Sequence, residues 1–193
     1  MRYLVLIFLL VAVILSGGCA GENQNTLDTT PKITPTQTST TNIPTLENKF
    51  IQYENLEMGF LINYDNSWNV TSGNLYYGVT RFSSPSGNSA VLISKWPYYG
   101  NFQSIDQMVK SFSDIYAKNN ITTLESGVIE GARYPTGFIS DKQIVMGTEF
   151  KGLQYLVQAR GDIYIIRYYS SDVSEYTRYE RMFKDMFQSF EVF

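Results

Sequence analysis

The chain has 193 residues, a formal net charge of −3 and 15% aromatic residues, which is enough for one globular domain of ordinary size. It contains no histidine and only one cysteine. These counts exclude histidine-based general-base catalysis, a triad that uses histidine, histidine-ligated zinc and an intrachain disulfide. The nearly balanced charge also argues against a nucleic-acid partner, because such a partner would require a basic stripe.

The N-terminus predicts a lipoprotein signal peptide over residues 1–18. Arg2 supplies a positive charge, and residues 4–15 form an apolar run that is shorter than the roughly 20 residues needed to span a bilayer. Small residues then stand directly before Cys19, a pattern that resembles the lipobox of prokaryotic lipoproteins. The resemblance implies that Cys19 is lipidated and anchors the protein to the cell membrane on its extracytoplasmic face. The alternative is an ordinary secreted protein with an unmodified cysteine.

Residues 19–48 predict a disordered linker that begins with the lipidated cysteine. They are rich in Thr, Pro and Asn and contain no aromatic residue, so they cannot bury enough apolar surface to offset the entropy of ordering. The threonines are candidates for O-linked sugar. Two sequons lie further along the chain, at Asn69 and Asn120, and are candidate glycosylation sites where the host has an N-glycosylation system.

Two segments beyond the linker predict helices. In residues 104–120, Ser104 begins a capping-box pattern and apolar residues then recur at spacings of three and four. Residues 170–190 repeat the same apolar spacing after candidate caps at Asp172 or Ser174. Both stripes are rich in aromatic residues and methionine, and we expect each of them to pack on a sheet.

The remainder of the globular domain, residues 49–193, predicts strands, because it alternates with a period of two or runs apolar between turn signals. Short links between several of these segments suit hairpins. One helix interrupts the strands and the other follows them. The expected fold class is therefore α+β, with an antiparallel sheet flanked by two main helices. The predicted strands are 49–55, 58–65, 75–83, 89–96, 121–130, 133–140, 142–150, 153–160 and 162–170.

Two stretches of the domain resemble the PsbP-like family. MGFLINYDNSWNV, residues 58–70, resembles the opening signature, in which a Gly-Phe pair and an alternating strand lead through a Tyr-Pro turn to a core tryptophan. MFKDMFQSFEVF, residues 182–193, is similar to the family's end, a helix that runs into a short Ser-Phe strand. The resemblance implies a Mog/PsbP-like αβα sandwich, with Asp65 in place of the expected proline. The implied fold determinants are Gly59, Phe60, Tyr64 and Trp68.

The segment KWPYYGNF predicts a recognition surface. It joins a predicted strand to the first helix, and aromatic residues on such a loop provide a large contact area at a small cost in entropy. The alternative is that these rings fold back and cap the sheet. The candidate binding residues are Trp96, Tyr98, Tyr99 and Phe102.

Three hypotheses about function follow, and none of them needs a cofactor or a metal. Members of the PsbP-like family are known mostly as binding and assembly proteins, so the resemblance implies no catalytic residues. The leading hypothesis is an anchored extracytoplasmic lipoprotein that binds or scaffolds an envelope protein complex. The second is a small-molecule or glycan binder with an aromatic-lined cleft between sheet and helix, and the third is a carboxylate-based enzyme whose acids meet only in the fold. The host, the partner and the oligomeric state stay open.

Overall fold

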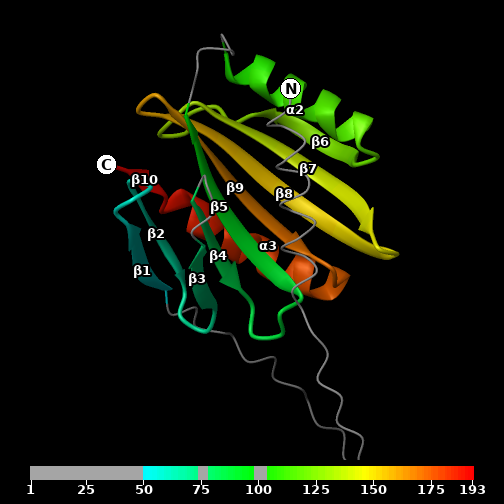
Figure 1. The fold of residues 1–193 in the computed structure, drawn as a ribbon, viewed down its shortest axis with the longest axis horizontal. Coiled ribbons are helices and arrows are strands. Elements are labelled where there is room, and N and C mark those ends of the chain that lie inside the picture. The colour runs from blue at the N-terminus through cyan, green and yellow to red at the C-terminus, as the bar shows by residue number, and fades with distance from the viewer. Residues whose placement is uncertain (1–49, 74–77, 98–103) are drawn as a thin grey trace, which may run out of the picture. The chain divides into compact units, whose positions relative to one another are not determined.

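Strands and two helices account for most of the residues that the computed structural model describes, which are 50–73, 78–97 and 104–193. The helices are α2 (Ile105–Lys118) and α3 (Val173–Gln188), as Figure 1 shows. The strands are β1 (Phe50–Asn55), β2 (Phe60–Asp65), β3 (Asn69–Gly73), β4 (Val79–Ser83), β5 (Ser89–Pro97), β6 (Thr122–Val128), β7 (Thr136–Val145), β8 (Thr148–Ala159), β9 (Asp162–Ser170) and β10 (Glu191–Val192).

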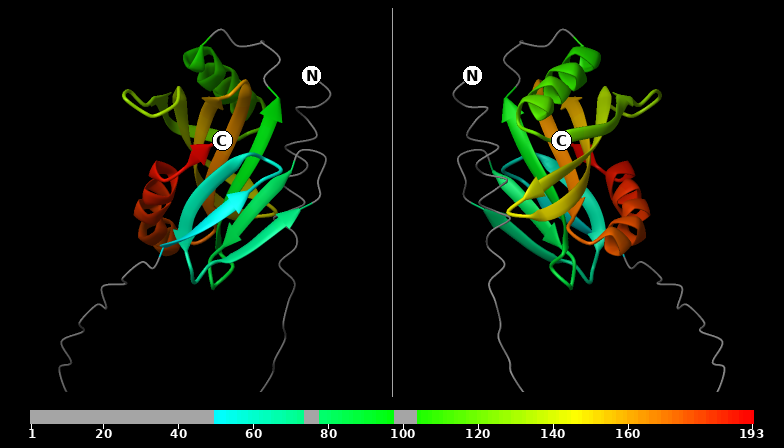
Figure 2. Two further views of the ribbon diagram at one scale, coloured as in Figure 1. Left: turned by 90° about the vertical axis from the view of Figure 1, so that its left-hand side faces the viewer. Right: turned by 90° about the vertical axis from the view of Figure 1, so that its right-hand side faces the viewer.

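The described strands form two antiparallel sheets. The larger sheet has the order β3-β4-β5-β9-β8-β7-β6, and the smaller sheet has the order β1-β2-β10. Helix α2 lies on one face of the larger sheet, over β6, β7 and β8, whereas α3 lies on the other face (Figures 1 and 2). The small sheet lies on the same side as α3, because β2 also contacts that helix. This arrangement confirms the expected α+β class and the antiparallel sheet flanked by two main helices.

The main core lies between the larger sheet, α3 and the small sheet. Successive side chains of a strand point to opposite faces, so Tyr155 and Val157 of β8 enter this core whereas Gln154 faces α2. Aromatic rings dominate the core, and each of them removes roughly 150–250 Å² from water when it is buried. The largest fully buried side chains of this core are Tyr164, Tyr168, Phe60, Phe82 and Phe183.

Both helices begin where the sequence predicts. The Ser104 hydroxyl accepts a hydrogen bond from the N–H of Gln107 at 3.3 Å. The Asp172 carboxylate accepts hydrogen bonds from the N–H groups of Ser174 and Glu175, so Asp172 rather than Ser174 is the cap of α3. In the described part of the chain, no helix is both long enough and apolar enough to cross a membrane.

The opening motif forms a turn that directs its tryptophan into the core. Gly59 adopts a φ of +71°, which glycine tolerates, and its N–H donates a hydrogen bond across the β1–β2 turn at 2.8 Å. Asp65 fixes the next turn in place of the expected proline, because its carboxylate accepts hydrogen bonds from the N–H and the hydroxyl of Ser67. Trp68 follows and is only 3% exposed, with its ring edge-on to Tyr179.

The boundaries predicted for two strands are wrong. Residues 133–140 and 142–150 are expected as separate strands, but β7 runs without a break through Asp141. The chain turns instead at Met146 and Gly147, which have φ values of +51° and +83°. The alternating pattern continues across this pair, and the positive φ values of a two-residue hairpin turn are not visible in apolar periodicity.

Two short strands also differ from expectation. β3 is not among the predicted strands, because Asn69–Gly73 is largely polar and forms an edge of the larger sheet, where only β4 pairs with it. The short strand expected at the C-terminal Ser-Phe pair forms at Glu191–Val192 instead. It pairs with β2 in the smaller sheet, with Val192 opposite Phe60.

Gly137 of β7 allows α2 to lie close to the sheet, because a Cβ at this position would overlap Val109 Cγ2 of the helix. We predict that Gly137→Ala lowers the free energy of unfolding by about 1–3 kcal/mol, as measured by urea denaturation. Val109→Ala removes the overlapping methyl group, so the double variant should lose less stability than the sum of the two single variants. Strict additivity would contradict this account of the helix–sheet contact.

Candidate binding site

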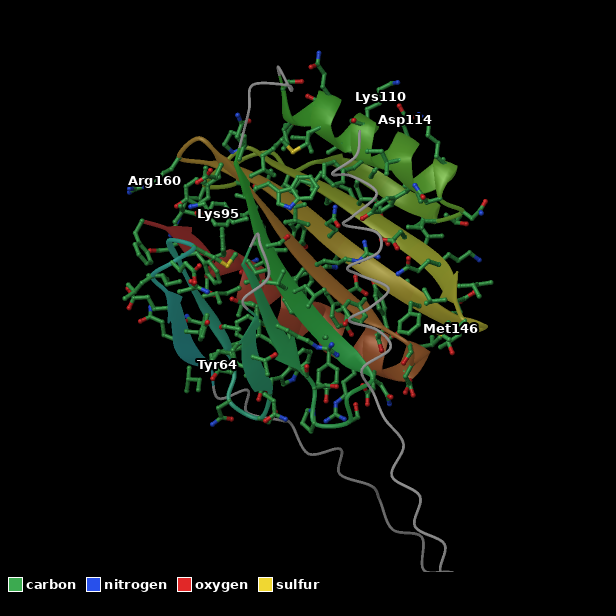
Figure 3. The ribbon with its side chains drawn as sticks, in the orientation of Figure 1. Tyr64, Lys95, Lys110, Asp114, Met146 and Arg160 are labelled. Carbon is green, nitrogen blue, oxygen red and sulfur yellow. The ribbon has the colours of Figure 1, made fainter. Side chains whose placement is uncertain are left out.

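The two ends of the domain present different features. The Phe50 end holds the start of β1, the β4–β5 turn and the β7–β8 turn, which contains Met146. The Phe193 end holds β10, the β1–β2 turn and the β8–β9 turn, which contains Arg160. Figure 3 shows Met146 and Arg160 at opposite ends of the long central strands.

A hollow with a volume of about 410 Å³ lies near the Phe193 end, between the C-terminal half of α3 and the chain segment 129–136. We call it the α3–β8 hollow, because Tyr155 of β8 also lines it. Its walls combine aromatic rings with two cationic side chains. The residues used below are Arg133, Tyr134, Tyr155, Lys184, Phe187 and Gln188.

Stacked rings form one wall of the α3–β8 hollow. Tyr155 is 6% exposed, and its ring centroid lies 3.9 Å from that of Phe187 and 5.2 Å from that of Phe183. Its hydroxyl makes no hydrogen bond to any residue that the structure describes. Burial, and then the nearby charge of Glu180, raise the pKa of Tyr155 to about 12. At neutral pH this phenol is protonated, as an exposed tyrosine also is, so its O–H can act as a donor.

Ion pairs lie at the edge of the hollow. The Lys184 ammonium lies 2.8 Å from the carboxylate of Glu180, and Arg133 pairs with Glu191 of β10. These side chains are about half exposed, so each pair contributes little to stability and can exchange its partner for a bound group. The Tyr134 hydroxyl accepts a hydrogen bond from the N–H of Val192, which ties the segment 129–136 to β10.

Aromatic and arginine side chains beside exposed ion pairs, as found in the α3–β8 hollow, are typical of protein recognition surfaces. Two exposed apolar residues lie at the same end of the domain: Leu56 is 77% exposed and Phe193 is 44% exposed. The N–H of Phe193 donates to the Gly59 carbonyl, so this residue is held against the β1–β2 turn. The arrangement suits a partner that fills the hollow with an apolar group and contacts the charges around it.

A second candidate is a buried polar cluster between α2 and the larger sheet. Arg167 donates to the Asp141 carboxylate at 2.8 Å and to the Tyr116 hydroxyl at 2.7 Å, and that hydroxyl donates to Gln154 at 2.8 Å. Burial by itself would lower the pKa of Arg167. The interactions with Tyr116 and Asp141 outweigh this effect of burial and hold the pKa of Arg167 above its usual value. A Cβ at Gly152 would lie about 3 Å from both members of the ion pair, so glycine leaves room for it.

The cluster does not have the composition of an acid–base catalytic site. Asp141 is its single acid, is fully buried and is already paired with Arg167. Two converging carboxylates would be needed for the carboxylate-based enzyme of the third hypothesis. Among residues 50–73, 78–97 and 104–193, no group of three or more acidic or cysteine side chains is placed to hold a metal ion.

The sequence-predicted site residues lie apart from the α3–β8 hollow. Trp96 is the penultimate residue of β5 and is half-buried, and its ring lies 6.1 Å from that of Phe112 in α2, on the other face of the sheet. The sequon asparagines Asn69 and Asn120 are both exposed, at the start of β3 and just after α2. The remaining predicted residues lie outside the described part of the chain; they are Cys19, Tyr98, Tyr99 and Phe102.

Sequence reasoning did not single out the residues of the hollow. Phe187 belongs to the apolar stripe of the predicted helix 170–190, and Tyr155 occupies an ordinary core position of a predicted strand. Neither pattern distinguishes the wall of a hollow from the interior of a core. Arg133 and Lys184 come from segments far apart in the chain, so only the tertiary structure brings them together.

Comparisons with known proteins support the fold. No protein-family model and no curated protein matches the sequence. Among solved structures, the chain is similar to cyanobacterial PsbP (CyanoP) from Synechocystis, with 12% identity, a TM-score of 0.59, and coverage of 76% of this chain and 94% of that one. It is also similar to the Saccharomyces cerevisiae Ran-binding protein Mog1p, with 6% identity, a TM-score of 0.54, and coverage of 74% and 95%. The described domain therefore has a PsbP/Mog1-like fold, as the resemblance in sequence predicts.

A third similar structure is PA94 of Pseudomonas aeruginosa, a protein of unknown function. It shares 13% identity and a TM-score of 0.50, with coverage of 72% of this chain and 94% of that one. At such identities the likeness concerns the fold alone.

The Asp141–Arg167 pair is expected to be essential for stability. Asp141→Asn leaves the guanidinium buried without a counter-charge, so we predict a loss of about 3 kcal/mol in the free energy of unfolding, as measured by urea denaturation. Adding Arg167→Met should restore part of this loss. The matched control is Asp114→Asn, which breaks the exposed Lys110–Asp114 pair and should cost under about 0.5 kcal/mol. Equal losses for the two single variants would contradict the prediction.

Tyr155 should make stability sensitive to alkaline pH. Its pKa is 10 in the unfolded chain and about 12 in the folded protein, so between these values only the unfolded state loses the phenolic proton. The free energy of unfolding should therefore fall as the pH rises through this window. Tyr155→Phe should reduce that fall and leave stability at neutral pH unchanged, because the hydroxyl has no hydrogen-bond partner among the described residues. Urea denaturation at several pH values measures both effects.

Tyr164→Phe is the comparison for the loss of stability at neutral pH, whereas at alkaline pH it shares the transition, because burial raises the pKa of Tyr164 too. The Tyr164 hydroxyl donates to the Met58 carbonyl at 2.8 Å, so its removal should cost about 1 kcal/mol even at neutral pH. A Tyr155→Phe variant whose stability follows the wild-type pH dependence would show that this phenol does not contribute to the alkaline transition.

Proposed function

We propose that the protein is a lipid-anchored extracytoplasmic lipoprotein whose PsbP-like domain binds a protein of the cell envelope and has no catalytic role. The observation that carries the binding proposal is the α3–β8 hollow, which combines a stacked aromatic wall with exposed ion pairs. It lies near the Phe193 end of the domain, where Tyr134 in its wall bonds to Val192 of β10.

The cellular location is proposed from the sequence. An apolar run too short to span a bilayer precedes small residues and Cys19, and a Thr-, Pro- and Asn-rich segment separates that cysteine from the domain. Two lipid chains would hold the protein at the membrane essentially permanently, since each buried methylene contributes about 0.8 kcal/mol. The linker would leave the domain free to meet a partner near the membrane surface.

The fold supports binding rather than chemistry. One of its solved relatives is a Ran-binding protein, which recognises another protein. The chain has no histidine, and the buried acid Asp141 is already paired with Arg167. The exposed apolar residues Leu56 and Phe193 lie at the same end of the domain and offer further apolar contact area to a protein partner.

A second candidate function is the binding of a small molecule or glycan in the same hollow. Its volume of about 410 Å³ is within the range of ligand pockets, and the hydroxyl of Tyr155, a lining residue, has no hydrogen-bond partner among the described residues. Stacked Tyr155 and Phe187 rings would suit a flat or cyclic ligand.

Site-specific photo-crosslinking in native membranes tests the two candidates. A photoreactive side chain at Gln188, which is exposed and lines the hollow, should form an adduct with a protein that mass spectrometry identifies. The same side chain at Lys110, exposed on α2, should not form this adduct. Phe187→Ala removes half of the ring stack and should reduce the yield by roughly tenfold, as the loss of an interface anchor does.

Each part of the proposal has its own contradicting outcome. An adduct with a small molecule instead of a protein would favour the second candidate function. Equal adducts at Gln188 and Lys110 would argue against the hollow as the binding surface. Cys19→Ser should release the protein from the membrane fraction, and a variant that stays membrane-bound would refute the lipid anchor.

A further inference from the structure

The β7–β8 hairpin projects beyond its neighbouring strands at the Phe50 end. β6 pairs with β7 only as far as Lys142, and β9 pairs with β8 only from Lys151 onward. Residues 143–150 therefore form a two-stranded ribbon that no other described strand flanks, as Figure 1 shows. Phe150 fixes the base of the ribbon through a ring contact with Tyr169, at 6.2 Å between centroids.

The tip of this ribbon exposes apolar side chains to water. Met146 is 92% exposed and Ile144 is 71% exposed. The charged residues of the ribbon and its base are Lys142, Glu149 and Lys151, so their charges nearly cancel. The tip is therefore an apolar projection with a balanced charged base, which is unusual for a hairpin turn in water.

Met146 also contradicts the local preference of its turn. Met146 and Gly147 have positive φ values, +51° and +83°, in a two-residue turn of a kind that favours Asn-Gly. The β8–β9 turn has the same geometry at Arg160 and Gly161, with φ values of +50° and +80°, and there the side chain is charged. A methionine in the left-handed region costs conformational energy and gains no packing at this exposure, so stability does not explain it.

The position of the tip suggests what it contacts. The described chain begins with β1, whose start lies at the same end of the strands as the β7–β8 turn but on the opposite side of the domain (Figure 1). A lipid on Cys19 and a flexible linker of residues 19–48 would keep the domain close to the bilayer and leave it free to turn, so that the tip can reach the lipid. This step rests on the proposed lipid anchor.

We propose that Ile144 and Met146 insert into the surface of the bilayer that holds the anchor. The tethered domain is then oriented with the α3–β8 hollow directed away from the membrane. Two side chains give only weak binding by themselves, but the tether keeps the tip at a high local concentration next to the lipid. Because the nearby charges nearly cancel, the contact depends on apolar burial and is insensitive to salt.

The test places residues 20–193 on vesicles without using Cys19. The domain, Asn48–Phe193, is one compact unit with its own core, so this chain retains the whole fold. An N-terminal polyhistidine tag holds it on vesicles of phosphatidylethanolamine, phosphatidylglycerol and a nickel-chelating lipid. Met146→Cys then carries the chain's single thiol and an environment-sensitive fluorophore, and Arg160→Cys is the control in a turn of the same geometry at the opposite end (Figure 3).

Brominated lipids should quench the fluorophore at position 146 and leave the one at position 160 unquenched, at both low and high salt. Equal quenching at the two positions would overturn the inference. A photoreactive side chain at Met146 that captures a protein in native membranes, with no lipid adduct, would also overturn it and would assign the tip to a protein partner.

A variant without the apolar tip completes the test. Ile144→Thr keeps a β-branched residue in the strand, and Met146→Asn creates the favoured Asn-Gly turn, so the double variant should fold at least as stably as the wild type. It should lower the vesicle partitioning of the untethered domain by roughly tenfold. Unchanged partitioning would contradict insertion.

The two proposals fail independently. If mass spectrometry of the mature protein finds Cys19 unmodified, the lipid anchor is refuted, while the polyhistidine-tethered measurement still reports whether the tip enters lipid. If Cys19 carries its lipid but the two fluorophores behave alike, the anchor stands and the insertion of the hairpin is refuted.

Discussion

The alternation of side chains along β8 and β9 is the constraint on which the rest of the structure depends. Gln154 and Tyr155 are neighbours in the chain, yet one faces α2 and the other faces α3. The same alternation in β9 sends Arg167 toward α2 and Tyr168 into the aromatic core. A shift of one residue would put the polar members into the apolar core, so the register is fixed. With the register fixed, the two helices and the wall of the α3–β8 hollow are fixed as well.

The buried polar cluster reinforces this register from the other face. Asp141, Gln154 and Arg167 come from three adjacent strands and meet Tyr116 of α2. A buried guanidinium is tolerated only where its counter-charge lies within hydrogen-bond distance, and Gly152 leaves the space that this pair requires. The cluster therefore specifies how β7, β8 and β9 align. A structural role accounts for its composition, because it contains one acid and one base that already neutralise each other.

The two ends of the domain have different proposed roles, which are membrane attachment and partner binding. The Phe50 end receives the chain from the predicted anchor and bears the apolar β7–β8 tip, whereas the Phe193 end bears the α3–β8 hollow. The strands run from one end to the other, so a domain held by the first end presents the second end to its surroundings (Figure 1). The proposed anchor and binding surface are compatible with this separation, because a binding surface away from the lipid is accessible to a large partner.

The sequence by itself determined the class of the fold, the two helices, the Ser104 cap and most of the strands. These features follow from periodicity, capping and turn chemistry, which act over a few residues. The core position of Trp68 was implied by the family resemblance, and the structure decided for Asp172 over Ser174 as the cap of α3. The tertiary structure alone decided the unbroken course of β7, the edge strand β3 and the residues of the hollow. Arg133, Tyr155 and Phe187 meet because three distant segments pack together, and no local pattern records that contact. Long-range packing decides where side chains converge, whereas local sequence decides only what each segment becomes.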